Sequence, residues 1–415
     1  MRIGIIGLGY VGLPLAVELA EAGHEIVAVD TDQRRVAALG EGQSYVEDVA
    51  SERVQACREQ LRPTTRYAEL VGVEAVLIAV PTPLSRNREP DLGPLVAAGT
   101  ALAEVLRRDQ LVVLESTTYP GTTRERLVPL LEESGLAAGR DFHVAFSPER
   151  VDPGRTDHTM RNTPKVVAGL TPVCLERAEA LYGEVCDELV AVSSLEAAEL
   201  SKLLENVFRS VNIALVNEIA ILCDRMGIDI WEVVDVAATK PYGFMRFDPG
   251  PGMGGHCLPV DPFYLAWKER EYDSPTEFIE LAGEVNQRMP YFCVEKVSEA
   301  LNEHSKPVRG SRVTIIGASY KPGVGDLRES PAIKIMRLLK DRGARLAYHD
   351  DHVPELPDFG LASEPLDLAL PEADVAVIVT AHPELDVEAV VRTAPLVVDF
   401  RGVTRGIEAP NLVRL

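Results

Sequence analysis

The chain has 415 residues, more than a single hydrophobic core normally supports, so two or three domains are expected. Its 64 acidic and 42 basic residues give a formal net charge of −22. Because no run of lysine or arginine interrupts this acidic composition, we expect no nucleic-acid partner. No segment reaches about 18 uncharged apolar residues, and glycines and glutamates interrupt the apolar N-terminus. We therefore expect neither a membrane span nor a signal peptide, and a cytoplasmic location.

The cysteines show neither a metal-binding nor a disulfide pattern. None forms a CxxC pair, and none stands at zinc-ligand spacing from a histidine. A chain of this length does not need disulfides, so composition alone predicts reduced, buried side chains and no metal site. The six are Cys57, Cys174, Cys186, Cys223, Cys257 and Cys293.

The N-terminal half alternates short apolar strands with helices. Strands are expected at 2–6, 25–30, 75–80, 111–116, 142–147, 165–169 and 186–192, and helices at 11–22, 91–108 and 172–183. Strands built continuously from valine, isoleucine and leucine are buried on both faces. This pattern predicts a parallel sheet covered by helices.

The middle of the chain changes character. Residues 195–239 lack strand signals and predict one long helix followed by a shorter helix that starts near Asp229. The segment 241–263 is so rich in glycine and proline that no regular structure is expected there, and helix returns over about 275–303. A helical block between two α/β halves favours a homodimer interface over a monomeric linker domain.

A second α/β unit follows a linker at 306–310, with strands expected at 312–317, 344–350, 374–380 and 396–400. The predicted fold class is therefore α/β. It has an N-terminal Rossmann-like domain (1–194), a central all-helical domain (195–305) and a C-terminal Rossmann-like α/β domain (311–415). The second unit lacks the glycine fingerprint of the first.

That fingerprint is Gly7-x-Gly9-x-x-Gly12, between the first strand and the first helix. The first glycine permits the turn, the second lets a pyrophosphate approach the backbone, and the third allows close packing of helix and strand. Asp30 ends the second strand, where its carboxylate would bind the adenosine ribose and repel a 2′-phosphate. The cofactor predicted is NAD. Arg35 either closes over the adenine or is a solvated helix residue.

Two further sets of residues carry chemistry. Lys202 and Asn206 are four residues apart on the long helix and share one face among apolar neighbours. Cys257 lies in GGHCLPVD, in a predicted loop with Asp261 beside it. A thiol in an NAD enzyme indicates aldehyde oxidation through a thiohemiacetal and a thioester. His256 is either a base or a packing residue, and these neighbours do not form a metal site.

Six segments of the chain, in order, resemble the UDP-glucose/GDP-mannose dehydrogenase family. They are GLGYVGLPLA, STTYPGTT, FSPERVDPG, KLLENVFRSVNIALVNE, PGPGMGGHCLPVDP and GASYKPGVGDLRESPA. The resemblance implies oxidation of a sugar C6 hydroxymethyl group to a carboxylate, with two NAD⁺ and one water consumed. It also implies a place in polysaccharide biosynthesis.

The resemblance also implies roles for individual residues. Cys257 would be the nucleophile, Lys202 and Asn206 would stabilise an oxyanion, and Glu149, Thr117 and Asp261 would position or activate water. The cofactor would contact Gly7, Gly9, Tyr10, Val11, Gly12, Asp30, Arg35, Thr82, Thr117 and Arg328. The substrate would contact Glu149, Arg150, Lys202, Asn206, Arg246, Gly254, Lys321 and Arg401, with Arg246 reaching a diphosphate across a dimer interface.

The identity of the sugar depends on the cysteine loop. His256 before the cysteine and Val260 before the aspartate depart from the GGSCFPKD-like loop of UDP-glucose enzymes. The segment GGHC followed by DPFYLAWK resembles the branch that acts on UDP-N-acetyl-hexosamines. UDP-N-acetylglucosamine is therefore the favoured substrate, and UDP- or dTDP-glucose is the alternative. A two-electron hydroxyacid or 6-phosphogluconate-type dehydrogenase and a non-catalytic NAD-sensing module are further alternatives.

Overall fold

A computed structural model describes residues 1–85, 87, 89–152, 157–255 and 257–415, except for the side chain of Cys257. Its contacts divide the chain into two compact units. The first contains residues 1–205 and 263–275, and the second contains residues 206–262 and 276–415. The helices α7 (Leu195–Met226) and α9 (Cys257–Lys268) contribute residues to both units.

The first unit is built on an eight-stranded sheet in the order β3-β2-β1-β4-β5-β6-β7-β8. Its strands are β1 (Arg2–Ile6), β2 (Glu25–Val29), β3 (Leu61–Thr64), β4 (Ala75–Ile78), β5 (Leu111–Leu114), β6 (His143–Phe146), β7 (Lys165–Gly169) and β8 (Leu189–Ala191). All neighbouring strands run parallel except β6 and β7. No helix is described between these two strands, and a parallel pair would require such a crossover.

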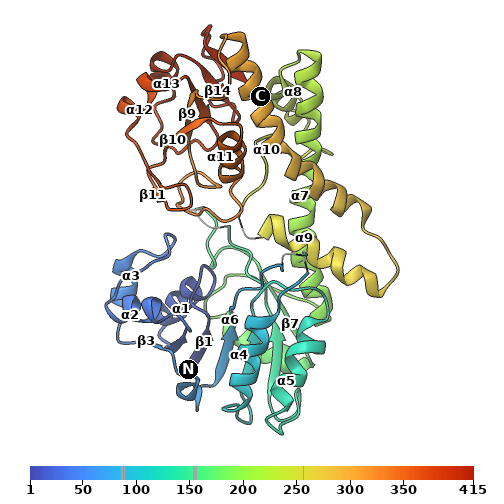
Figure 1. Ribbon diagram of the computed structural model, residues 1–415. Helices are drawn as coiled ribbons and strands as arrows, with labels where there is room; N and C mark the ends of the chain where they lie inside the picture. Colours follow the sequence, from blue (N-terminus) through green and yellow to red (C-terminus); the bar gives the residue numbers. More distant parts are fainter. Residues whose placement is uncertain (86, 88, 153–156, 256) are drawn as a thin grey trace. The chain divides into compact units, whose positions relative to one another are not determined.

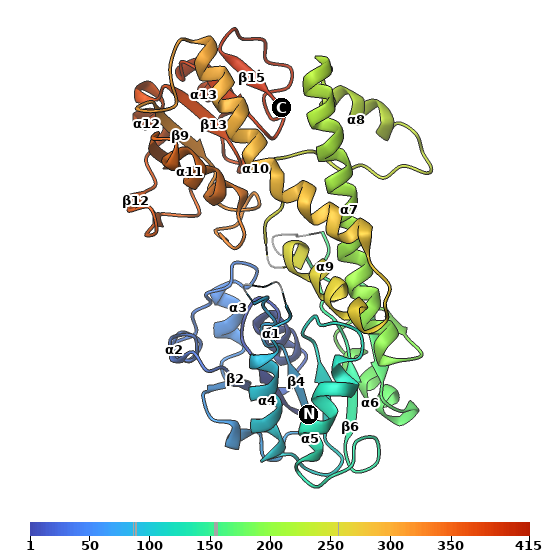
Figure 2. The same ribbon diagram turned by 45° about the vertical axis from the view of Figure 1, so that its right-hand side comes forward.

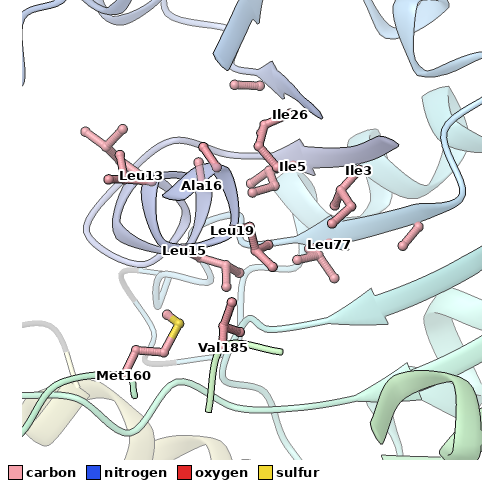
Figure 3. Close-up of a cluster of buried hydrophobic side chains, with 14 of the residues drawn as sticks. Ile3, Ile5, Leu13, Leu15, Ala16, Leu19, Ile26, Leu77, Met160 and Val185 are labelled. Carbon is pink, nitrogen blue, oxygen red and sulfur yellow. The ribbon is translucent and has the colours of Figure 1, made fainter. Parts of the chain in front are cut away.

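The helices of the first unit cover both faces of this sheet, because two separate clusters of buried side chains include residues from alternate sides of its strands. The helices are α1 (Gly12–Glu21), α2 (Gln33–Gly40), α3 (Ser51–Ala56), α4 (Gly93–Ala103), α5 (Val128–Glu132) and α6 (Pro172–Tyr182). Figure 3 shows Leu15 and Leu19 of α1 against Ile5 and Leu77 of the sheet. These four side chains are fully buried, each worth about 1.5–3 kcal/mol of hydrophobic stabilisation.

The second unit contains a five-stranded parallel sheet in the order β10-β9-β13-β14-β15. Its strands are β9 (Arg312–Ile316), β10 (Arg345–His349), β13 (Val375–Ile378), β14 (Val397–Asp399) and β15 (Leu412–Arg414), beside a small hairpin of β11 (Glu355–Leu356) and β12 (Leu361–Ala362). Its helices include α8 (Ile230–Ala238), α10 (Glu277–Glu303), α11 (Pro331–Asp341), α12 (Leu366–Glu372) and α13 (Val387–Thr393). The predicted second doubly wound sheet is therefore confirmed.

The second unit also contains α10 and most of α7. α7 and α10 lie side by side in both views (Figures 1 and 2), and Cys223 of α7 belongs to the same buried cluster as Val294 of α10. Lys296 pairs with Asp224 at 2.8 Å across the two helices. Asp229 caps α8 by accepting a hydrogen bond from the Trp231 N–H at 2.8 Å, as the expected helix start requires.

The prediction that 241–263 lacks regular structure is wrong at its C-terminal end, because α9 begins at Cys257. Pro259 is tolerated in the first helical turn, where the backbone N–H has no partner within the helix. Pro262 removes one hydrogen bond inside α9, but burial of Tyr264 and Lys268 stabilises the remainder of the helix. Cys257 thus starts a helix and does not lie in a loop.

Two further expectations concern the cysteines and the apolar segments. The five cysteines whose side chains are described are free and buried, as composition predicts. Among the described helices, α7 alone is long and apolar enough to cross a membrane, with a mean hydropathy of 1.3 over its most apolar 18 residues. Length and composition are weak evidence by themselves, since long core helices share these properties.

Candidate active site

A sharp turn connects β1 to α1. Gly7 has a φ of +91°, and a Cβ there would lie 2.4 Å from the carbonyl oxygen of Ala79. A Cβ on Gly12 would lie 1.8 Å from the carbonyl oxygen of Gly7. A Cβ on Gly9, by contrast, would have no neighbour within 4 Å among the described residues. The open side of Gly9 is where a pyrophosphate can approach the backbone and the N-terminus of α1.

Asp30 follows β2 and is 7% exposed. Its Oδ2 accepts hydrogen bonds from the backbone N–H of Leu8 at 2.8 Å and from Arg35 at 3.2 Å. The Arg35 guanidinium also lies 5.6 Å from the ring centroid of Tyr45. Arg35 is therefore engaged with the acid, and a negative charge at this strand end suits an unphosphorylated ribose, as in NAD.

Other predicted cofactor residues lie at or near the carboxyl ends of further strands in the same sheet. Thr82 follows β4 and Thr117 follows β5, and the Thr82 hydroxyl donates to the carbonyl oxygen of Thr117 at 2.8 Å. The Tyr264 hydroxyl donates to the carbonyl oxygen of Thr82. Val11 caps α1, and Tyr10 packs against the adjacent core. The structure therefore brings these residues to one edge of the sheet, where open α/β sheets bind their ligands.

Glu149 follows β6, and hydrogen bonds fix its carboxylate. Its Oε1 accepts from the backbone N–H groups of Arg150 and Val151, both at 2.7 Å. Its Oε2 lies 3.8 Å from the ammonium of Lys165, the first residue of β7. Two backbone donors and one cation thus hold Glu149 in a single orientation.

Arg150 is occupied by groups of the protein itself. It donates to the carbonyl oxygen of Pro164 at 2.6 Å and pairs with Glu205 at 2.7 Å. Lys202, by contrast, is 9% exposed, and no described residue accepts a hydrogen bond from its ammonium. A largely buried lysine whose ammonium has no protein partner among the described residues suits an anionic or polar ligand.

Asn206 and Asp261 are brought together. The Asn206 amide donates to Asp261 Oδ2 at 2.5 Å, and Asp261 is only 1% exposed. Asp261 stands one helical turn after Cys257 in α9. His256 and the side chain of Cys257 lie outside the described residues.

Gly254 and Gly255 precede the cysteine. A Cβ on Gly254 would lie 2.5 Å from Cβ of Tyr320, and the Gly255 N–H donates to the carbonyl oxygen of Arg328 at 2.8 Å. The segment before Cys257 therefore packs closely against the loop that carries Lys321 and Arg328. The Lys321 backbone accepts a hydrogen bond from Ser319 at 3.0 Å.

The three predicted arginines of the second unit have different environments. Burial lowers the pKa of Arg401, a Cβ on Gly250 would lie 2.8 Å from its guanidinium, and no described side chain pairs with that guanidinium. Arg328 forms an ion pair with Asp326 at 2.6 Å. Arg246 pairs with Asp235 at 2.7 Å, and its side chain is 37% exposed. Arg246 thus stands at the surface, whereas Arg401 is positioned to receive an anion.

Sequence reasoning missed the buried cluster around Lys165. Its ammonium lies 3.0 Å from Oε2 of Glu115, and the Tyr182 hydroxyl donates to the other oxygen of Glu115. Burial opposes a charge on Lys165, yet the carboxylates of Glu115 and Glu149 raise its pKa. The available signal was a charged residue adjoining an apolar strand, in LVVLES and again in KVVAG.

Glu199 of α7 was also missed. Its carboxylate accepts hydrogen bonds from the Gly121 N–H at 2.5 Å and from the N–H and hydroxyl of Thr123 at 2.8 and 2.6 Å. Burial raises the pKa of Glu199 to about 7. This side chain fixes the loop that follows Thr117.

A dinucleotide-binding Rossmann-type domain, a set of long helices and a second doubly wound sheet define an NAD-dependent dehydrogenase built from two α/β halves. Three family models specify which kind of dehydrogenase this is. Models of the UDP-glucose/GDP-mannose dehydrogenase family match over its NAD binding domain (residues 1–186), its central domain (196–288) and its UDP binding domain (314–406). The chain belongs to the UDP-glucose/GDP-mannose dehydrogenase family.

Relatives with similar chains are known. A UDP-N-acetyl-D-glucosamine 6-dehydrogenase of Pseudomonas aeruginosa is 38% identical over 356 residues, which cover 85% of this chain and 83% of that protein. A UDP-N-acetyl-D-mannosamine dehydrogenase of Pyrococcus horikoshii is 34% identical, covering 98% of this chain and 100% of that protein. The solved structure of a UDP-D-ManNAc dehydrogenase from Pyrococcus horikoshii matches with a TM-score of 0.91 at 32% identity, covering 100% of this chain and 99% of that one.

The protein is therefore an NAD-dependent nucleotide-sugar dehydrogenase, an oxidoreductase with NAD as its cofactor. The predicted fold class is confirmed. The UDP binding domain and the names of the relatives support a UDP-sugar as substrate. A two-electron hydroxyacid dehydrogenase would not need the matched domain at 314–406. The domain boundaries and the roles of individual residues stay predictions.

Proposed function

We propose that this chain oxidises the C6 hydroxymethyl group of UDP-N-acetylglucosamine to a carboxylate through a covalent intermediate on Cys257. The observation that carries the proposal is the buried 2.5 Å hydrogen bond between Asn206 and Asp261, one helical turn from Cys257 along α9. The mutual hydrogen bond offsets the cost of burying these two polar side chains, and it fixes the orientation of the Asn206 amide.

The N-acetyl sugar is supported by the loop sequence and by the relatives. His256 and Val260 depart from the loop expected for UDP-glucose enzymes. Both relatives described above are dehydrogenases of UDP-N-acetyl-hexosamines, one named for the gluco and one for the manno sugar. UDP-N-acetylmannosamine is therefore the second candidate, and UDP- or dTDP-glucose is the alternative without the acetyl group.

Two oxidations and one hydrolysis would convert the hydroxymethyl group to the carboxylate. When bound, NAD⁺ accepts one hydride in each of two successive oxidations. The alcohol first becomes an aldehyde and loses a proton. The Cys257 thiolate then adds to the aldehyde carbon, and the thiohemiacetal becomes a thioester in the second oxidation. Water attacks the thioester carbonyl, the bond from carbon to sulfur breaks, and the carboxylate leaves as the thiol is restored.

Lys202 and Asn206 would act on the oxygen at C6. They lie one turn apart on α7, where an ammonium and an amide N–H can both donate to a developing oxyanion. The Asp261 carboxylate accepts from the Asn206 amide and so holds one of its hydrogens, which orients the other. The start of α9 at Cys257 would favour the thiolate, because a helix N-terminus stabilises negative charge.

Glu149 and Thr117 would position the hydrolytic water, with Asp261 as the further candidate. Glu149 suits this task because its carboxylate is held by backbone donors and by Lys165. Arg401 and Lys321 would bind the nucleotide end of the substrate close to Gly254. Arg401 has the stronger support, since its half-buried guanidinium lacks a described side-chain partner.

The long helix α7 supports a homodimer. Five large apolar side chains recur at helical spacing along its C-terminal part and are each more than a third exposed: Phe208, Leu215, Ile219, Leu222 and Met226. A second copy of this chain would bury the stripe, and Arg246 would then reach its partner's substrate. We place the enzyme in the cytoplasm, where its uronic acid product would enter polysaccharide biosynthesis.

A panel of sugar nucleotides tests the proposal. The purified enzyme is incubated with NAD⁺ and UDP-N-acetylglucosamine, UDP-N-acetylmannosamine, UDP-N-acetylgalactosamine, UDP-glucose or dTDP-glucose. We expect two NADH per acid released, with the highest kcat/KM for UDP-N-acetylglucosamine. One NADH per turnover would disprove the four-electron reaction, and a preference for another sugar would overturn only the substrate assignment.

A further inference from the structure

The buried cation Lys165 has a second neighbour that the proposed reaction uses. Lys165 opens β7, and its ammonium is held between two carboxylates, 3.0 Å from Glu115 and 3.8 Å from Glu149. Its side chain is 4% exposed, that of Glu115 is 0% exposed and that of Glu149 is 16% exposed. The pair of Lys165 and Glu115 is thus shielded from bulk solvent, while the side chain of Glu149 is partly exposed.

A small cavity adjoins the same cation. It has a volume of about 10 Å³, and its lining includes Glu149, Thr163 and Lys165. The buried Oε2 of Glu149 and Oγ1 of Thr163 have no hydrogen-bond partner among the described residues. One water needs about 10–15 Å³ and two to four polar partners, and this cavity offers both.

We propose that Lys165 is a positioning residue for Glu149, and that the two share one buried water with Thr163. Glu115 and Tyr182 fix the ammonium from the far side, through the ion pair and through a Tyr182 ring 4.9 Å from Nζ. The ammonium then holds Oε2 of Glu149, and the backbone N–H groups of Arg150 and Val151 hold Oε1. The inference rests on the proposed role of Glu149 in thioester hydrolysis.

The test separates hydrolysis from oxidation. The Glu115→Gln/Lys165→Met variant replaces the ion pair with neutral side chains of similar size, so neither member of that pair is left charged without its partner. In a rapid-mixing experiment with NAD⁺ and UDP-N-acetylglucosamine, we expect a burst of two NADH per active site at the wild-type rate. Steady-state turnover should then fall at least about tenfold, since misplacing a reacting group costs up to about 100-fold. The acyl-enzyme should accumulate in intact-protein mass spectra.

Combination with Glu149→Gln shows whether Lys165 acts through Glu149. Glu149→Gln alone should slow hydrolysis, and adding Glu115→Gln/Lys165→Met should slow it no further. If the two effects multiply, or if Glu115→Gln/Lys165→Met hydrolyses at the wild-type rate, the inference is wrong. If Glu149→Gln itself hydrolyses the thioester at the wild-type rate, the proposed role of Glu149 is wrong. This result differs from those that would disprove the role of Lys165.

Two further variants serve as a test of the shared water and as a control for changes in the packing of the cluster. Thr163→Val removes a polar partner at the cavity and does not touch the ion pair, so it keeps the proposal testable if the neutral pair does not fold. We expect slower hydrolysis after an unchanged burst, and wild-type hydrolysis would overturn the shared water. Cys186→Ala changes a buried neighbour of the cluster without changing its charge, and it should leave both phases unchanged.

Discussion

Replacing Gly9 with alanine should separate binding of the cofactor from stability of the fold. A Cβ at Gly9 meets no described atom within 4 Å, and its φ is not in the left-handed region, so alanine fits the folded backbone. The new methyl group would occupy the space in which the pyrophosphate approaches the turn. A Cβ at Gly12, by contrast, would lie 1.8 Å from a backbone oxygen and must disturb the fold itself.

The expected magnitudes follow from these contacts. Gly9→Ala should leave the free energy of unfolding within about 1 kcal/mol of wild type, because alanine at a compatible position reduces the entropy of the unfolded chain. Loss of close approach should weaken NAD⁺ binding about tenfold or more, or about 1.4 kcal/mol. At an NAD⁺ concentration that stabilises the wild type by about 2.7 kcal/mol, the variant should gain about 1.4 kcal/mol or less.

The assay is denaturant unfolding of both proteins with and without NAD⁺, together with titration calorimetry. Gly40→Ala is the matched control, because its Cβ would meet only Pro63 at 4.0 Å and lies away from the turn. It should leave the affinity for NAD⁺ unchanged and keep the free energy of unfolding within about 1 kcal/mol of wild type. If Gly9→Ala binds NAD⁺ as tightly as the wild type, the cofactor does not approach the backbone at Gly9, and the reasoning is refuted.

Three other substitutions, one of them with an exposed-site control, test separate parts of the structure. Folding raises the pKa of Glu199 from 4.5 to about 7, so its contribution to stability is complete below pH 4.5 and is lost as the pH rises through 7. The free energy of unfolding of Glu199→Gln should therefore rise relative to wild type by up to about 3 kcal/mol over that range, and a constant difference would contradict the assignment. Leu15→Ala should cost about 2–5 kcal/mol in denaturant titrations, whereas Val96→Ala at an exposed position should cost much less. Sedimentation velocity should show the wild type as the proposed homodimer and Leu222→Glu as a monomer, and a monomeric wild type would disprove the proposed dimer.

Local patterns were sufficient to predict the framework of this protein. Apolar runs located most strands of both sheets, and the glycine spacing located the turn before α1, but the edge strands β3 and β15 were not predicted. Asp229 marked the start of α8, because a helix cap involves only neighbouring residues. These features depend on interactions within a few residues.

Features that depend on distant contacts could not be predicted. The strand β7 runs antiparallel to β6 because no crossover helix is described between them. The start of α9 at Cys257 depends on the burial of residues further along that helix. Lys165 and Glu115 are 50 residues apart, and nothing in the sequence pairs them. The approach of Gly250 to Arg401 is likewise visible only in the folded chain.

Trapping of the covalent intermediate tests the central claim most directly. The enzyme is mixed with excess NAD⁺ and UDP-N-acetylglucosamine, quenched with acid within one turnover, and digested for peptide mass spectrometry. The account predicts that the peptide containing Cys257 gains the mass of the uronyl nucleotide less one water, and that Cys257→Ser binds NAD⁺ but forms no such adduct and no acid. Net four-electron turnover by Cys257→Ser, or an adduct on another residue, would contradict it.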